Sequence, residues 1–104
     1  MTKISNEKYI ALENNEVVSQ IFGNLDENAK IIEDELGIEL SLKNGGILIR
    51  GDRVTSKLGE KLIENLVEII KKQKKLTKQE LRYTIRLIYE GREKGIRELL
   101  DETI

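Results

Sequence analysis

The sequence contains no cysteine, histidine, proline or tryptophan. The absence of cysteine and histidine excludes thiol nucleophiles, imidazole acid–base catalysis and zinc sites built on those side chains. A chain of 104 residues has the length of one domain and can bury a modest core without a disulfide or a metal. We therefore expect one small recognition or coupling module without a catalytic site of its own.

No apolar run approaches the roughly 18 residues that a membrane-spanning helix needs, and the N-terminal residues do not have the pattern of a secretory signal. Together with the absence of cysteine, these features favour a soluble, cytoplasmic protein without a membrane partner. Charged residues make up 36% of the chain but nearly cancel to a net charge of −1, so there is no overall nucleic-acid signature.

The charges are distributed unevenly along the chain. Residues 1–40 hold nine acids and three bases, whereas residues 41–97 hold fifteen bases and seven acids. The densest basic segment consists of Lys71, Lys72, Lys74, Lys75, Lys78, Arg82 and Arg86. This asymmetry indicates two surfaces with different partners.

The first elements are short. Lys8–Leu12 is a candidate strand, and Asn14 or Asn15 can cap a helix that runs to about Ile21 and is broken by Gly23.

A second helix is predicted to begin near Asp26, whose carboxylate can cap the first amides, and to end at Gly37. One face of this helix carries an apolar stripe at helical spacing, formed by Leu25, Ala29, Ile32 and Leu36.

The middle of the chain predicts a β-hairpin. Ile38–Lys43 alternates apolar and polar residues, which is typical of a strand with one buried face. Asn44-Gly45-Gly46 supplies the residues of a tight turn, and Ile47–Ile49 forms the return strand.

Helices are predicted for the rest of the chain. The first covers about Arg53 to Gln73, with one face lined by Val54, Leu58, Leu62, Leu66 and Ile69 or Ile70. Thr77-x-x-Glu80 is a capping box that opens the next helix, which ends at Gly91. A last short helix is predicted around Ile96, Leu99 and Leu100.

The expected order β-α-α-β-β-α resembles the type I KH fold. A KH domain carries the pattern I-I-G-x-x-G between its first two helices, and Ile21-Phe22-Gly23-Asn24-Leu25-Asp26 occupies that position here. In KH domains this loop brings backbone amides close to nucleic-acid phosphates. Asp26 replaces the second glycine, and its carboxylate repels phosphate, so we expect a weaker phosphate contact than the KH pattern implies.

The chain also resembles the N-terminal domain of the PhoH-like, phosphate starvation-inducible P-loop ATPase family. The resemblance rests on Ile21–Leu36, Ile49–Asp52 and Leu76–Gly91, and the last segment lies outside the KH pattern. In that family a KH-like domain precedes an ATPase domain that binds ATP and Mg²⁺, and members are thought to act in RNA metabolism. The nucleotide-binding motif G-x-x-x-x-G-K-[ST] has no counterpart in this chain, because Gly46–Asp52 has Asp where the motif needs Lys.

The resemblance implies that the chain is a fragment without the ATPase domain, is not an enzyme and holds no cofactor. It implies an accessory domain that positions single-stranded RNA or couples it to ATP turnover in the ATPase domain of the parent protein. The alternative, from the charge asymmetry, is a protein-interaction or oligomerisation module, such as a homo-oligomer, that binds no nucleic acid.

Candidate nucleic-acid contacts come from the loop, the second helix and the basic segment. They are Gly23, Asn24, Lys30, Lys71, Lys72, Lys74, Lys75, Arg82 and Arg86. The loop can instead be only a tight helix–helix turn or a contact with the ATPase domain, with Leu25 packed in the apolar stripe.

The lysines can instead be a solvated helix end that complements the helix dipole. Tyr83, between Arg82 and Arg86, is the best candidate for base stacking, although a core or interface role is the alternative.

The expected fold class is α+β, with a three-stranded sheet covered on one face by helices. We expect a KH-like domain at residues 1–74 and a C-terminal helical extension at residues 75–104.

Overall fold

A computed structural model describes residues 5–91. The helix predicted around Ile96, Leu99 and Leu100 lies outside these residues. The elements follow one another as β1 (Asn6–Ala11), α1 (Asn15–Phe22), a 3₁₀ turn η1 (Asn24–Asp26), α2 (Glu27–Leu36), β2 (Glu39–Lys43), β3 (Gly46–Gly51), α3 (Arg53–Gln73) and α4 (Lys78–Glu90).

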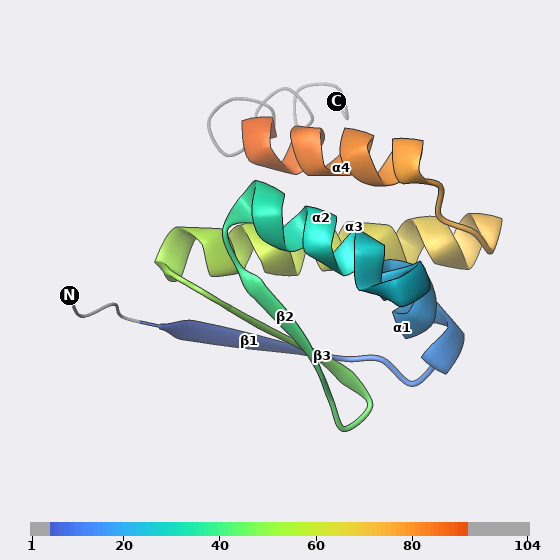
Figure 1. The fold of residues 1–104 in the computed structure, drawn as a ribbon, viewed down its shortest axis with the longest axis horizontal. Helices are drawn as coiled ribbons and strands as arrows, with labels where there is room; N and C mark the ends of the chain where they lie inside the picture. The colour runs from blue at the N-terminus through green and yellow to red at the C-terminus, as the bar shows by residue number, and fades with distance from the viewer. Residues whose placement is uncertain (1–4, 92–104) are drawn as a thin grey trace, which may run out of the picture.

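The three strands form one antiparallel sheet in the order β1-β3-β2 (Figure 1). The predicted α+β class with a three-stranded sheet is therefore confirmed. β1 begins at Asn6, two residues before the predicted strand, because Asn6 pairs with Gly51 and Glu7 pairs with Arg50. The Glu7 carboxylate lies 3.1 Å from Nε of Arg50, so a cross-strand ion pair accompanies the added length.

The β2–β3 hairpin is held by an aromatic side chain from β1. Gly46 has no side chain, and a Cβ there would lie 2.7 Å from the ring of Tyr9. The ring of Tyr9 therefore crosses β3, and its hydroxyl donates to the carbonyl oxygens of Lys43 and Asn44 at 3.0 and 2.8 Å. This contact ties β1 to the tip of the β2–β3 hairpin.

The helices cover one face of the sheet in two layers. α2 and α3 lie next to the strands, α1 packs against α2 and α3, and α4 packs on the side of α2 and α3 that faces away from the sheet (Figure 1). One core contains strand residues, α3 residues and two residues of α4, for example Ile47, Ile49, Leu62, Leu66, Leu81 and Ile85. The division into residues 1–74 and 75–104 stays a prediction.

Two residues predicted to face the core are exposed instead. Leu42 points to the same face of the sheet as the buried Leu40, but 60% of it is exposed. It lies near the end of β2, where α1 does not cover it. Val54 lies in the first turn of α3 and is 46% exposed. Apolar periodicity identifies a face but not the point at which the covering layer ends.

Both long helices begin with reciprocal caps. Asp52 and Thr55 exchange side-chain and backbone hydrogen bonds at the start of α3, and Thr77 and Glu80 do the same at the start of α4. The capping box predicted at Thr77 is confirmed. Within residues 5–91, no helix combines the length and the apolar character needed to cross a bilayer.

Candidate nucleic-acid interface

The turn between α1 and α2 has an unusual backbone. Gly23 has φ 80° and ψ 175°, and Leu25 and Asp26 have left-handed φ values of 54° and 60°. A helix N-cap normally has an extended backbone that turns its side chain toward the first amides. The left-handed Asp26 makes no such hydrogen bond, so the predicted side-chain cap at Asp26 is wrong. Instead, its N–H donates to the carbonyl of Gly23 at 3.2 Å.

Leu25 does not pack in the apolar stripe of α2. It is 90% exposed, because the left-handed backbone at the turn directs the side chain away from the core. The stripe begins at Ala29, which is buried. The prediction that Leu25 packs as its first residue is wrong.

A buried amide fixes the turn from inside. Asn28 is 5% exposed, and its side chain donates to the carbonyl of Gln20 at 3.1 Å. A Cβ at Gly23 would lie 2.7 Å from Cγ of Asn28. Glycine is therefore required at this position both by its backbone angles and by the close approach of Asn28.

Side-chain contacts join this turn to the connection between α3 and α4. Gln20 donates from Nε2 to the carbonyl of Lys74 at 3.1 Å and accepts from the N–H of Leu76 at 3.1 Å. Lys78 lies 3.1 Å from the Glu27 carboxylate and 3.4 Å from the Asn28 side-chain oxygen. Two segments that lie about fifty residues apart are thereby held side by side.

A hollow of about 850 Å³ lies between these two segments. We call it the lysine hollow; its lining includes Glu16, Gln20, Gly23, Asn24, Leu25, Glu27, Asn28, Lys74, Lys75 and Lys78. Three bases and two acids line it, which leaves one net positive charge. Four predicted site residues, Gly23, Asn24, Lys74 and Lys75, thus share one surface.

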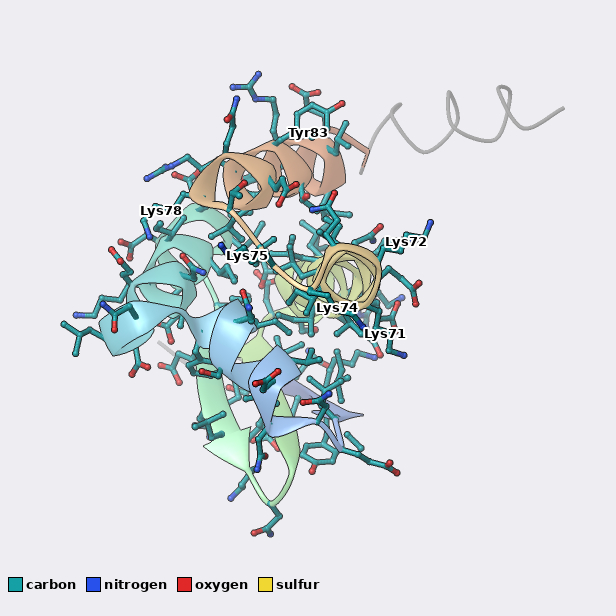
Figure 2. All side chains as sticks on the ribbon, turned by 90° about the vertical axis from the view of Figure 1, so that its right-hand side faces the viewer. Lys71, Lys72, Lys74, Lys75, Lys78 and Tyr83 are labelled. Carbon is teal, nitrogen blue, oxygen red and sulfur yellow. The ribbon has the colours of Figure 1, made fainter. Side chains whose placement is uncertain are left out.

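The other predicted site residues lie elsewhere. Lys71 and Lys72 are in the last turn of α3, where they complement the helix dipole, and Figure 2 shows them on the side of α3 away from α2. Lys30 is exposed on α2 and does not line the lysine hollow. Arg82 and Arg86 line a separate hollow together with Glu35 and Tyr89.

Tyr83 is 61% exposed on α4, so it is not a core residue. Figure 2 shows it on the far side of α4 from Lys74 and Lys75. A base stacked on Tyr83 would therefore not lie in the lysine hollow.

A second hollow, of about 450 Å³, lies on the other side of the turn. We call it the apolar hollow; its lining includes Val18, Phe22, Gly23, Asp26, Leu42 and Lys43. Asp26 lines the apolar hollow and not the lysine hollow. Asp26 therefore lies on the side of the turn that faces the apolar hollow, whereas the other side of the turn lies beside the lysines of the lysine hollow.

The sequence analysis missed Gln20 and Asn28, which organise the site. Asn28 stands four positions before the buried Ile32, so it falls on the inner face of α2. A polar residue at an inward position is a signal for a buried hydrogen bond, and Asn28 could have been recognised in this way. The role of Gln20 depends on the return of α3, which no local pattern in α1 indicates.

The chemistry of the lysine hollow is that of an anion contact. Lysine ammonium groups attract phosphate as point charges. The described residues include no group of three or more carboxylates placed to hold a metal ion. Comparisons of the chain with protein-family models, curated proteins and solved structures found no match.

Proposed function

We propose that the chain is a non-catalytic, KH-like accessory domain of a PhoH-like ATP-binding protein and that it contacts single-stranded RNA through the lysine hollow. The observation that carries the proposal is the meeting of the Gly23–Asn24 turn with Lys74 and Lys75 in one hollow. Neither the Gly23–Asn24 turn nor the segment with Lys74 and Lys75 provides on its own both a backbone that a phosphate can approach and positively charged side chains.

The order of elements supports the KH-like part of this proposal. One strand, two helices joined by a glycine turn, a hairpin and a long helix follow one another, as they do in the type I KH fold. The ATP and Mg²⁺ of the parent family belong to its ATPase domain, so in this proposal the chain positions RNA for that domain and hydrolyses no ATP.

Asp26 determines the side of the turn on which phosphate binds. Its carboxylate repels phosphate from the apolar hollow, whereas Lys74, Lys75 and Lys78 attract it to the lysine hollow. Glu27 neutralises part of the charge of Lys78 through their 3.1 Å ion pair. We therefore expect modest affinity with a strong dependence on salt.

Fluorescence anisotropy with a labelled single-stranded RNA tests this proposal. The double variant Lys74→Glu/Lys75→Glu should abolish most binding at low salt. If each lysine neutralises one phosphate, replacing both should lower the slope of log affinity against log salt by roughly 1.4.

The matched control is Lys57→Glu/Lys61→Glu, which makes the same charge change in a different hollow on α3. The control should bind RNA nearly as well as the unchanged chain. Equal losses in both variants would show that only net charge matters, and no binding to the unchanged chain at low salt would refute the proposal.

The second candidate function is a protein-interaction or oligomerisation module without nucleic-acid binding. Leu25 favours it, because leucine seldom adopts a left-handed backbone and residues held in such conformations cluster at contact and functional sites; its side chain is 90% exposed. No RNA binding even at low salt, together with self-association of the chain, would favour this candidate.

A further inference from the structure

Residues other than glycine with a left-handed backbone gather at the two hollows beside the turn. Within residues 5–91 they are Leu25, Asp26, Asn44 and Lys74. Leu25 and Lys74 line the lysine hollow, whereas Asp26 and Asn44 line the apolar hollow. Such conformations cost energy in residues with a side chain, and they cluster at ligand-binding sites. In the lysine hollow the strain falls on one apolar and one cationic side chain.

Leu25 gains no core packing in return for its conformation, since almost its whole side chain is in water. The turn that carries it is supported by other residues. Asn28 fills the space behind Gly23, and Gln20 joins α1 to the α3–α4 connection through two hydrogen bonds. Asparagine and glycine adopt a left-handed backbone at a lower cost than leucine. The leucine side chain is therefore better explained by a contact with a ligand than by the fold.

Charge divides the lysine hollow into two parts. Lys74 and Lys75 line it from the α3–α4 connection, and their ammonium groups attract phosphate. Leu25 and Glu27 line it from the turn, where the charge of Glu27 is balanced by Lys78 at 3.1 Å. The turn therefore offers an apolar side chain without a net attraction for anions. A ligand that fits both parts has an anionic group and, joined to it, an uncharged group with an apolar face.

A single-stranded RNA has both of these groups in every nucleotide. Leucine is among the apolar side chains that proteins place against the faces of bases. In a duplex the neighbouring bases cover these faces, whereas an unpaired base exposes them. No aromatic side chain lines the lysine hollow in the part of the chain that the structure describes, and its other apolar residue, Leu76, packs against the core. The base contact in this hollow therefore falls to Leu25.

We propose that Leu25 packs against an unpaired base of an RNA strand whose phosphates contact Lys74 and Lys75. This inference rests on the proposed function and deepens it, because the contact makes the site selective for single strands over duplexes. The lysines supply the part of the affinity that depends on salt, and Leu25 supplies a part that depends on the bases.

Anisotropy titrations with two strands that differ only in their bases test the contact. One probe is a short labelled single strand of uridine, and the other is a strand of the same length built from abasic ribose phosphates. Both strands carry the same phosphates, so the lysines contribute equally to both affinities. The unchanged chain should bind the uridine strand roughly fivefold or more tightly than the abasic strand.

Three variants separate the two parts of the site. Leu25→Asn removes the apolar side chain and tolerates the left-handed backbone. It should lower the affinity for the uridine strand to that for the abasic strand and leave the salt slope unchanged. Lys75→Gln should lower the salt slope by roughly 0.7 and keep the preference for uridine. Leu87→Asn, at another exposed leucine on α4, is the matched control and should change neither quantity.

Urea unfolding distinguishes a binding role of Leu25 from a role in the fold. Because asparagine tolerates the left-handed backbone better than leucine, Leu25→Asn should leave the urea midpoint unchanged or raise it. A lower midpoint would assign Leu25 to the fold and overturn the inference.

The titrations also separate this inference from the proposed function. Salt-dependent binding of both strands with equal affinity, or a preference for uridine that survives Leu25→Asn, would overturn the inference and leave the proposed function standing. Binding of neither strand at low salt would overturn both. Binding of an acidic, leucine-containing peptide that depends on Leu25, without a preference for uridine, would assign the hollow to a protein partner instead.

Discussion

At the scale of single residues, the turn between α1 and α2 depends on glycine at position 23. The backbone angles of Gly23, φ 80° and ψ 175°, lie in a region that is almost closed to other residues. Asn28 occupies the space in which a side chain at position 23 would lie. The left-handed residues Leu25 and Asp26 follow closely in the same turn, so the backbone conformation of the whole turn depends on glycine at position 23.

Gly23→Ala should therefore destabilise the chain by about 3 kcal/mol or more, from backbone strain together with the clash with Asn28. Gly37→Ala is the matched control, because Gly37 also has a positive φ, 69°, but a methyl group added there would meet nothing within 4 Å among the described residues beyond its own chain neighbours. It should cost only about 1–2 kcal/mol. Urea unfolding measures both, and equal losses would show that the contact with Asn28 contributes nothing.

At the scale of elements, local signals in the sequence were sufficient to predict most helices and strands. These signals depend only on residues that lie close together in the sequence. They are the Thr77–Glu80 capping box, the glycine turn of the hairpin and the apolar stripe of α3. The errors at Leu25, Asp26 and Leu42 have a different origin. The first two depend on a left-handed turn held by Asn28 and Gln20, and the third depends on where α1 stops covering β2.

The capping box of α4 predicts a pH dependence of stability. The backbone N–H of Thr77 and the side chain of Gln73 donate to the Glu80 carboxylate, and these bonds lower its pKa below the usual value. A lowered pKa in the folded state stabilises the fold at pH values above the ordinary pKa of the carboxyl group. This stabilisation is lost as the pH falls through the folded-state pKa.

Glu80→Gln removes this titration. The unfolding free energy of the unchanged chain should exceed that of the variant at neutral pH, and the difference should shrink as the pH is lowered into the acidic range. Urea unfolding at a series of pH values measures the difference, and a difference independent of pH would contradict the assignment.

At the scale of the whole molecule, the fold brings together the acidic first part of the chain and the basic second part. α3 has 21 residues and is about 31 Å long, so its end returns to the turn at the end of α1. This return places Lys74, Lys75 and Lys78 beside Glu16 and Glu27. The sequence showed the basic segment but not which of its residues meet the turn, because that depends on the length and direction of α3. Lys71 and Lys72, two neighbours in sequence, face elsewhere.

The central claim is that single-stranded RNA binds across the lysine hollow, and an NMR titration of the ¹⁵N-labelled chain with a short single-stranded RNA tests it most directly. At low salt we predict that amide signals shift at Gly23, Asn24 and Lys74–Lys78, while those of Lys57 and Lys61 stay in place. No shift on RNA addition, or shifts confined to Arg82 and Arg86 or to the open face of the sheet, would contradict the account.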